Sequence, residues 1–150
     1  MEHKNLAPIL IVEDEPDHSR LIKKSLVALG HVLNDLFLCE NGQDALDYLH
    51  KVGKYKNLKR PLPSLILLDI KMPFKNGFEV LKEVKEDDKL NKIPVVILTT
   101  TSTDEDIEHA MNLGANDYIV KPINFGVFTE KVSKLGLYWG LISDVKKILK

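Results

Sequence analysis

The stretch Leu65-Ile66-Leu67-Leu68-Asp69 is a short apolar run that ends in a carboxylate. Three further apolar runs lead into polar residues in the same way, and they cover residues 9–12, 95–98 and 118–120. Amphipathic stretches of helical length separate these runs. Short apolar runs that alternate with such stretches predict a parallel sheet covered by helices.

The complete alternation predicts five strand–helix units in a single domain that spans residues 1–150. A weaker strand is expected over residues 33–39, and the basic stretch 53–64 is expected to form a loop. Right-handed crossovers leave the order 2-1-3-4-5 as the most economical topology of this doubly wound, flavodoxin-like α/β fold. We expect its core over residues 8–135 and a helical extension over residues 136–150.

Bulk composition excludes several classes of function. The net charge is −1, with 21 basic and 22 acidic residues, so long-range electrostatics do not favour nucleic acid. No apolar run approaches the roughly 20 residues that cross a bilayer, and the polar N-terminus does not resemble a signal peptide. The single cysteine, Cys39, is expected to be a buried thiol in a reducing cytosol. We therefore expect a cytoplasmic protein without direct contact to DNA or membrane.

Polar residues follow the strands at the edge where the carboxyl ends of parallel strands meet. They are Glu13, Asp14, Asp69, Thr99 and Lys121. Taken one at a time, each has an ordinary explanation: the acids would cap a helix, the threonine would be a strand residue and the lysine a surface amine. Taken together, they form a site for a divalent cation and a phosphoryl group.

Three carboxylates at one point of the sheet repel one another, and a bound cation would relieve that repulsion. Mg²⁺ needs only one or two protein carboxylates besides a phosphate oxygen, whereas zinc would need a Cys/His cluster that the chain lacks. In the mechanism that this set favours, Asp69 attacks a phosphoryl donor and becomes an aspartyl phosphate. The metal, Lys121 and Thr99 would share the charge of the equatorial phosphoryl oxygens.

Four motifs extend this pattern beyond the single residues. They are VEDEP at 12–16, LDIKMPFKNG at 68–77, LTT at 98–100 and GANDYIVKP at 114–122. Any one of them alone would be weak, but jointly they are specific. From about Ile9 to Leu135 the chain resembles the receiver domain of two-component response regulators.

The resemblance implies a phosphoacceptor and a metal site. Asp69 would accept the phosphoryl group, and Mg²⁺ would be held by Asp14, Asp69 and the backbone carbonyl of Lys71. Glu13 stands where many receivers carry aspartate, and it would act on the metal through a water molecule. Such a protein is a signalling phosphoacceptor rather than an enzyme, although it catalyses its own phosphotransfer and a slow autodephosphorylation.

The resemblance also implies a phosphoryl contact and a switch. Lys121 would contact the phosphoryl group. The sequence itself favours a cis Lys121–Pro122 peptide bond, because Pro122 follows the lysine and this geometry would aim its side chain. Thr99 would reach towards the phosphoryl group, and Tyr118 would turn inward in response. This population shift would bias the surface formed by the fourth helix, fifth strand and fifth helix.

Partners follow from the same resemblance. The phosphoryl donor would be a sensor histidine kinase or a phosphotransfer protein, and the output would be a downstream protein target. The loop at 53–64, the pair Thr99-Thr100 and the pair Tyr138-Trp139 resemble the single-domain regulators that partner bacterial phytochromes. Only 19 residues follow Lys131, too few for a DNA-binding unit.

The end of the chain carries apolar residues spaced by three and four, which places them on one helical seam. They are Leu135, Tyr138, Ile142, Val145 and Leu149. The seam either forms a homodimer or partner contact, together with the face of the fourth helix, fifth strand and fifth helix, or packs on the protein's own core. The sequence leaves both open.

Other functions fit the residues less well. A phosphatase that uses an aspartyl phosphate needs a second acid two residues after Asp69, where the chain has Lys71. A flavodoxin-like cofactor binder needs a phosphate-binding loop after the first strand, where Glu13-Asp14-Glu15 repels an anion. A histidine phosphotransfer protein would be all helical. The alternative that stays open is a receiver-shaped interaction module that works without phosphorylation, although an intact acidic pocket argues against it.

Overall fold

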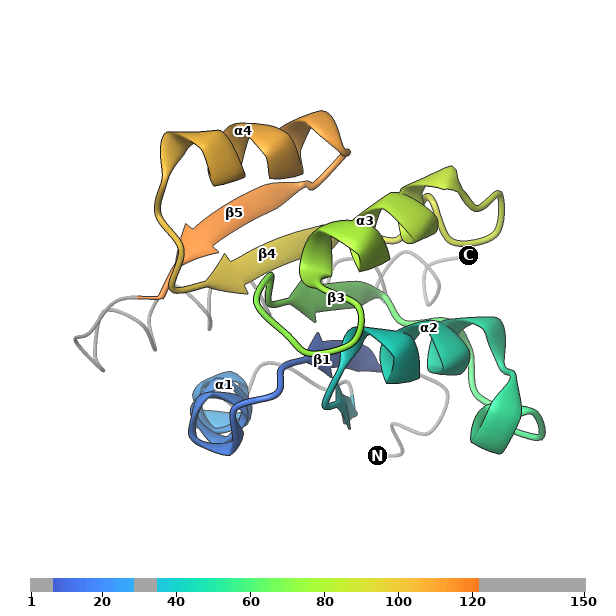
Figure 1. Ribbon diagram of the computed structural model, residues 1–150. Coiled ribbons are helices and arrows are strands. Elements are labelled where there is room, and N and C mark those ends of the chain that lie inside the picture. Colours follow the sequence, from blue (N-terminus) through green and yellow to red (C-terminus); the bar gives the residue numbers. More distant parts are fainter. Residues whose placement is uncertain (1–6, 29–34, 122–150) are drawn as a thin grey trace, which may run out of the picture.

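The computed structural model describes residues 7–28 and 35–121 and shows a five-stranded parallel sheet of order β2-β1-β3-β4-β5 (Figure 1). The strands are β1 (Ile9–Val12), β2 (Leu36–Cys39), β3 (Leu65–Leu68), β4 (Val95–Thr99) and β5 (Asp117–Val120). Every neighbouring pair is parallel. The predicted fold class and strand order are confirmed.

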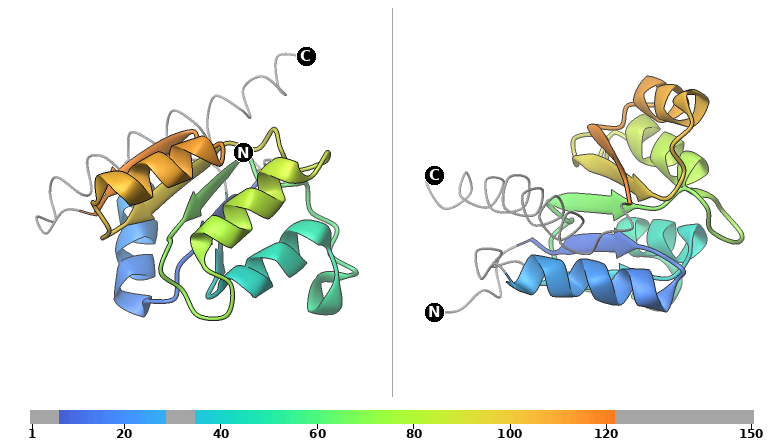
Figure 2. Two further views of the ribbon diagram at one scale, coloured as in Figure 1. Left: turned by 45° about the horizontal axis from the view of Figure 1, so that its top comes forward. Right: turned by 90° about the vertical axis from the view of Figure 1, so that its left-hand side faces the viewer.

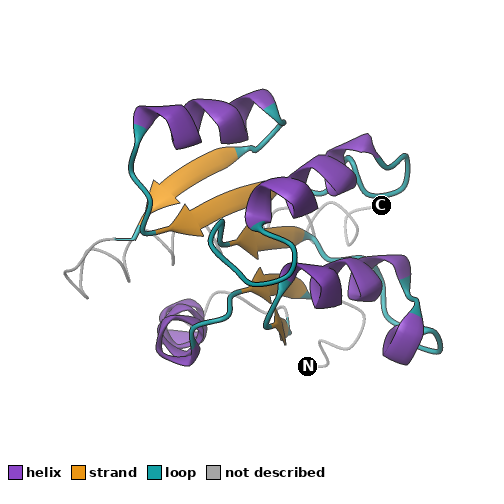
Figure 3. Ribbon diagram, in the orientation of Figure 1, coloured by secondary structure: helices purple, strands orange, loops and turns teal. Residues whose placement is uncertain are grey.

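Helices connect the strands and cover both faces of the sheet. They are α1 (Pro16–Ala28), α2 (Gly42–His50), α3 (Gly77–Glu86) and α4 (Asp104–Asn112). The views in Figure 2 place α1 on the opposite side of the sheet from α2 and α3. The stretch expected to be a loop at 53–64 contains one short 3₁₀ helix, η1 (Gly53–Tyr55), and is otherwise irregular (Figure 3).

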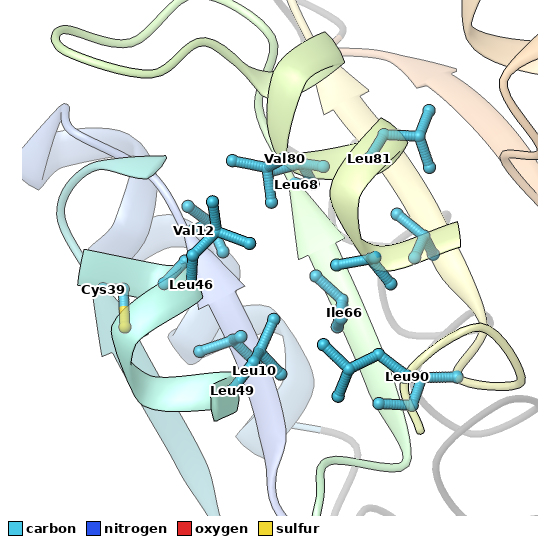
Figure 4. Packing of buried hydrophobic residues seen from close by; sticks show 14 of the residues in the cluster. Leu10, Val12, Cys39, Leu46, Leu49, Ile66, Leu68, Val80, Leu81 and Leu90 are labelled. Carbon is cyan, nitrogen blue, oxygen red and sulfur yellow. The ribbon is translucent and has the colours of Figure 1, made fainter. Parts of the chain in front are cut away.

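Alternation of side chains along the strands divides the core in two. Ile9 and Ile11 point to the face that α1 covers, where they pack in one cluster with Ile22 of that helix. Leu10 and Val12 point to the other face and join the cluster beneath α2 and α3 (Figure 4). Because both faces of the sheet are covered, the central strands β1 and β3 are buried and apolar at every position.

Local signals fix where the helices begin and end. The side chain of Asn41 accepts a hydrogen bond from the main chain of α2, and Thr103 does the same for α4. Asn76 and Glu79 form a reciprocal capping box at the start of α3. Gly114 follows α4 with φ +104°, a conformation that favours glycine over residues with a side chain.

Several predictions fall outside the described residues. They concern residues 33 and 34 of the second strand, the Lys121–Pro122 peptide bond, the fifth helix and the tail at 136–150. Cys39 is buried, as expected. Within residues 7–28 and 35–121, the structure contains no helix long and apolar enough to cross a membrane.

Candidate functional site

Three carboxylates converge where β1 and β3 end. One oxygen atom each from Glu13, Asp14 and Asp69 lies within 4.8 Å of the other two. The two strands are hydrogen-bonded neighbours, and the main-chain N–H of Asp69 still donates to the carbonyl of Val12 at 3.1 Å. Glu13 and Asp69 are buried and Asp14 is partly exposed. The acids that the sequence singled out therefore form one cluster.

Lys121 brings a cation to the carboxylates from the end of β5. Its main-chain N–H donates to the carbonyl of Thr99 at 2.7 Å, which holds the end of β5 beside the end of β4. Its Nζ donates to the carboxylate of Glu13 and lies 3.5 Å from Oδ2 of Asp69. The side chain is only 6% exposed, so Lys121 is not a surface amine.

The cluster carries more negative than positive charge. Burial raises the pKa of Glu13; the ammonium of Lys121 opposes this shift, and the charge of Asp69 adds to it. Three carboxylates facing one ammonium leave an excess of negative charge, and a divalent cation would balance it. All the protein ligands would be oxygen atoms, the donors that Mg²⁺ and Mn²⁺ prefer. The residues present therefore fit such an ion.

Two threonines after β4 bear hydroxyl groups without a partner among the described residues. Thr99 is fully buried, and its Oγ1 makes no hydrogen bond there; the same holds for Oγ1 of Thr101. A buried hydroxyl without a partner costs free energy, which a ligand oxygen can recover. Tyr118 is partly buried, and its hydroxyl donates to the carbonyl of Thr101 at 2.8 Å.

The loop between β3 and α3 holds the main chain of Asp69 in place. The main-chain N–H of Gly77 donates to the carbonyl of Ile70 at 2.8 Å, and a Cβ at Gly77 would lie 2.2 Å from the carbonyl oxygen of Asp69. Oδ1 of Asp69 accepts from the N–H of Ile70 at 2.7 Å. Lys71, expected to offer its carbonyl to the metal, lies in this loop with an exposed side chain. Phe74 is 85% exposed and has φ +66°.

His18 was not selected from the sequence. Its Nδ1 lies 3.0 Å from Nζ of Lys121 and 3.7 Å from Oε1 of Glu13. The five histidines are scattered along the chain, so composition gave no reason to choose one. The usable signal was its position in the sequence. Pro16 begins a helix three residues after Glu13, which places residue 18 in the first turn, beside the strand ends.

The sequence around this cluster matches a known protein family. The family model described as the response regulator receiver domain matches residues 9–133. The chain belongs to this receiver family. Phosphorylation-dependent signalling is the function of this family, whose members act as signalling phosphoacceptors. The predicted family and its coarse function are confirmed.

Two regulatory proteins match this receiver over most of its length. It is 38% identical over 133 residues to the probable methanogenesis regulatory protein FilR2 of Methanothrix harundinacea, covering 87% of this chain and 82% of that protein. It is 36% identical over 131 residues to the response regulator Rcp1 of Synechocystis, covering 87% of each.

Two solved structures share the fold of this receiver closely. The phosphorylated cyanobacterial phytochrome response regulator RcpA superposes with a TM-score of 0.82 and 38% identity, covering 89% of this chain and 94% of that one. The Mn²⁺-bound form of Rcp1 superposes with a TM-score of 0.81 and 34% identity over the same shares. Both resemble the single-domain type that the sequence predicted.

Proposed function

We propose that Asp69 of this receiver takes a phosphoryl group from a phosphohistidine and holds it as an aspartyl phosphate. One carboxylate oxygen of Asp69 would form the new bond to phosphorus, while the bond between phosphorus and the imidazole nitrogen of the donor breaks and its electron pair stays on that nitrogen. The supporting observation is the convergence of Glu13, Asp14 and Asp69 beside the ammonium of Lys121.

The orientation of Asp69 suits it to this role. Oδ1 is held by the N–H of Ile70, and Oδ2 lies on the side of Lys121. The ammonium of Lys121 would bind an oxygen of the incoming group, and the partnerless hydroxyl of Thr99 would donate to another. A donor that is held before the reaction, as the Lys121 ammonium is by Glu13, needs little reorganisation when charge shifts onto the phosphoryl oxygens.

The metal in this proposal is Mg²⁺. Asp14, Asp69 and the backbone carbonyl of Lys71 would hold it directly, with Glu13 acting through a water molecule. When bound, the ion neutralises charge on the transferring group. The Mn²⁺-bound form of the relative Rcp1 supports a divalent ion at an acidic pocket of this kind. Autodephosphorylation, as predicted for the chain, would regenerate the free carboxylate slowly.

Thr99 and Tyr118 form the switch in this proposal. Phosphorylation adds nearly two negative charges beside Thr99, whose hydroxyl would turn to the new oxygens. The hydrogen bond from Tyr118 to Thr101 would differ in population between the phosphorylated and the unphosphorylated protein. The population shift would reach the surface around α4 and β5.

A sensor histidine kinase, of the phytochrome type that the likeness to RcpA favours, or a phosphotransfer protein would be the donor. We propose one receiver domain with its core at 8–135 and a helical extension at 136–150, working in the cytoplasm on a downstream protein. A homodimer through the α4–β5 face and the extension belongs to the same proposal. An interaction module that works without phosphorylation is the alternative.

Intact mass spectrometry separates these two functions. The protein is treated with Mg²⁺ and acetyl phosphate, and we expect wild type and Asp17→Asn, whose exposed carboxylate is a matched control, to gain one phosphoryl mass. Asp69→Asn should gain none. No gain on wild type, or the same gain on Asp69→Asn, would reject Asp69 as the acceptor and leave the phosphorylation-independent module.

A further inference from the structure

We infer that His18 is a positioning residue for Lys121: its imidazole orients the lysine ammonium towards the oxygen of Asp69 that receives the phosphoryl group. The inference rests on the proposed function and adds a residue to the phosphoryl site. Its observation is the 3.0 Å separation between Nδ1 of His18 and Nζ of Lys121.

The direction of this hydrogen bond follows from its donor. A lysine ammonium has three N–H donors and no acceptor, so Nδ1 of His18 has to accept. His18 therefore carries its ring proton on Nε2 when it contacts Lys121. An acceptor without charge can orient an ammonium without competing for it as strongly as a carboxylate does.

The neighbours of Lys121 show what this bond achieves. One N–H is taken by the carboxylate of Glu13 and a second by His18. Oδ2 of Asp69, at 3.5 Å, lies just beyond ordinary hydrogen-bond length. The third N–H is thus free to point towards Oδ2 of Asp69, where a phosphoryl oxygen would bind. With two of three donors fixed, the ammonium is ordered before the reaction takes place.

Lys121 is much less exposed than the imidazole that it contacts. The side chain of Lys121 is 6% exposed, whereas that of His18 is 40% exposed. The imidazole stands on α1, whose first turn starts three residues after Glu13. Through this side chain α1 contributes to the proposed phosphoryl site.

Two substitutions at one position distinguish orientation from packing. His18→Leu keeps the branched shape at Cγ but removes the acceptor, whereas Oδ1 in His18→Asn can occupy the place of Nδ1. His50→Leu is the matched control, because His50 is 39% exposed, faces the carboxylate of Asp87 at 3.8 Å and lies on α2 rather than in the cluster.

The experiment is phosphorylation of the full chain by acetyl phosphate at increasing Mg²⁺ concentrations. We expect His18→Leu to lower the limiting rate about 10-fold, the smaller end of what loss of an outer partner costs at such sites. The Mg²⁺ concentration at half-saturation should stay the same, because a neutral side chain leaves the charge of the cluster unchanged. His18→Asn should recover most of the rate, and His50→Leu should match wild type.

The inference is overturned if His18→Leu reacts as fast as wild type, if Leu and Asn lower the rate equally, or if only the half-saturating Mg²⁺ concentration changes. In each of these results Asp69 is still phosphorylated, so the proposed function stands. Failure of wild type to react would instead reject the proposed function. Circular dichroism on each variant confirms that the rates are compared between folded proteins.

Discussion

The hydroxyl of Tyr118 on β5 donates a 2.8 Å hydrogen bond to the main-chain carbonyl of Thr101, two residues beyond Thr99. This bond ties the fifth strand to the loop that follows β4. In the proposed switch, a change at Thr99 would reach Tyr118 through this loop.

The first prediction concerns the pH dependence of stability at Tyr118. Burial raises the pKa of its hydroxyl from 10.0 to about 12, with smaller contributions from Asp106 and Asp69. The unfolded chain releases this proton near pH 10, while the folded chain keeps it. Stability from this group is therefore complete below pH 10 and is lost as the pH rises towards 12. Burial also raises the pKa of Tyr48 and Tyr55, which add to the same slope.

Tyr118→Phe tests this by urea unfolding at several pH values. The variant should lose about 1 kcal/mol of unfolding free energy at neutral pH, the usual worth of one hydrogen bond. Its stability should then fall less steeply than that of wild type between pH 10 and 12. Identical slopes for the two proteins would show that Tyr118 titrates normally in the folded state.

The second prediction concerns the contact behind Asp69. Gly77→Ala would place a Cβ 2.2 Å from the carbonyl oxygen of Asp69, so the backbone has to move. We expect a loss of about 1–3 kcal/mol in unfolding free energy, typical of overpacking, and slower phosphorylation of Asp69. Lys82→Ala on the exposed side of α3 is the control and should change stability by less than about 0.5 kcal/mol. Equal stability of the two variants would contradict the steric account.

The third prediction is a gain in stability. Phe74 has φ +66° and is 85% exposed, so its ring adds little packing while its backbone is in the left-handed region. Asparagine tolerates that region better. Phe74→Asn should raise the unfolding free energy by about 0.5–1 kcal/mol, because asparagine recovers part of the roughly 1–2 kcal/mol that a left-handed residue costs. Phe74→Ala keeps the left-handed strain and should not raise the unfolding free energy. A similar gain in both variants would mean that loss of the exposed ring, and not relief of strain, causes it.

The fourth prediction concerns Mg²⁺ and thermal stability. An ion that binds only the folded protein stabilises it by about 2.7 kcal/mol at 100 times its dissociation constant. Mg²⁺ should therefore raise the thermal midpoint, and a chelator should reverse the rise. Asp14→Asn removes a proposed ligand and should suppress the shift, while Asp17→Asn should keep it. An unchanged midpoint for wild type, or a full shift for Asp14→Asn, would argue against the ion site.

Much of the fold could be predicted because local patterns and topology rules agree. The apolar run 65–68 had to be a buried strand, and Asp69 had to stand at its carboxyl end. The rule for crossovers then brought Glu13 and Asp14 to the same place. The caps at Asn41 and Thr103 reinforced the element boundaries, because each residue satisfies a free main-chain N–H of the helix it precedes.

What the sequence could not supply were contacts that depend on side-chain direction. His18 and Lys121 are 103 residues apart, and their approach depends on the first turn of α1 and on the rotamer of a long side chain. Likewise, no propensity marks Phe74 as left-handed; that conformation follows from the way loop 69–77 has to turn before α3. The short helix η1 was missed because three residues give no periodic pattern.

The most direct test of the central claim is to locate the phosphoryl group. After reaction with acetyl phosphate and Mg²⁺, borohydride reduction converts an aspartyl phosphate to homoserine, and peptide sequencing by mass spectrometry finds its position. We predict homoserine at position 69 alone. Homoserine at position 14 or elsewhere, or unmodified peptide at every position, would contradict the claim that Asp69 accepts the phosphoryl group.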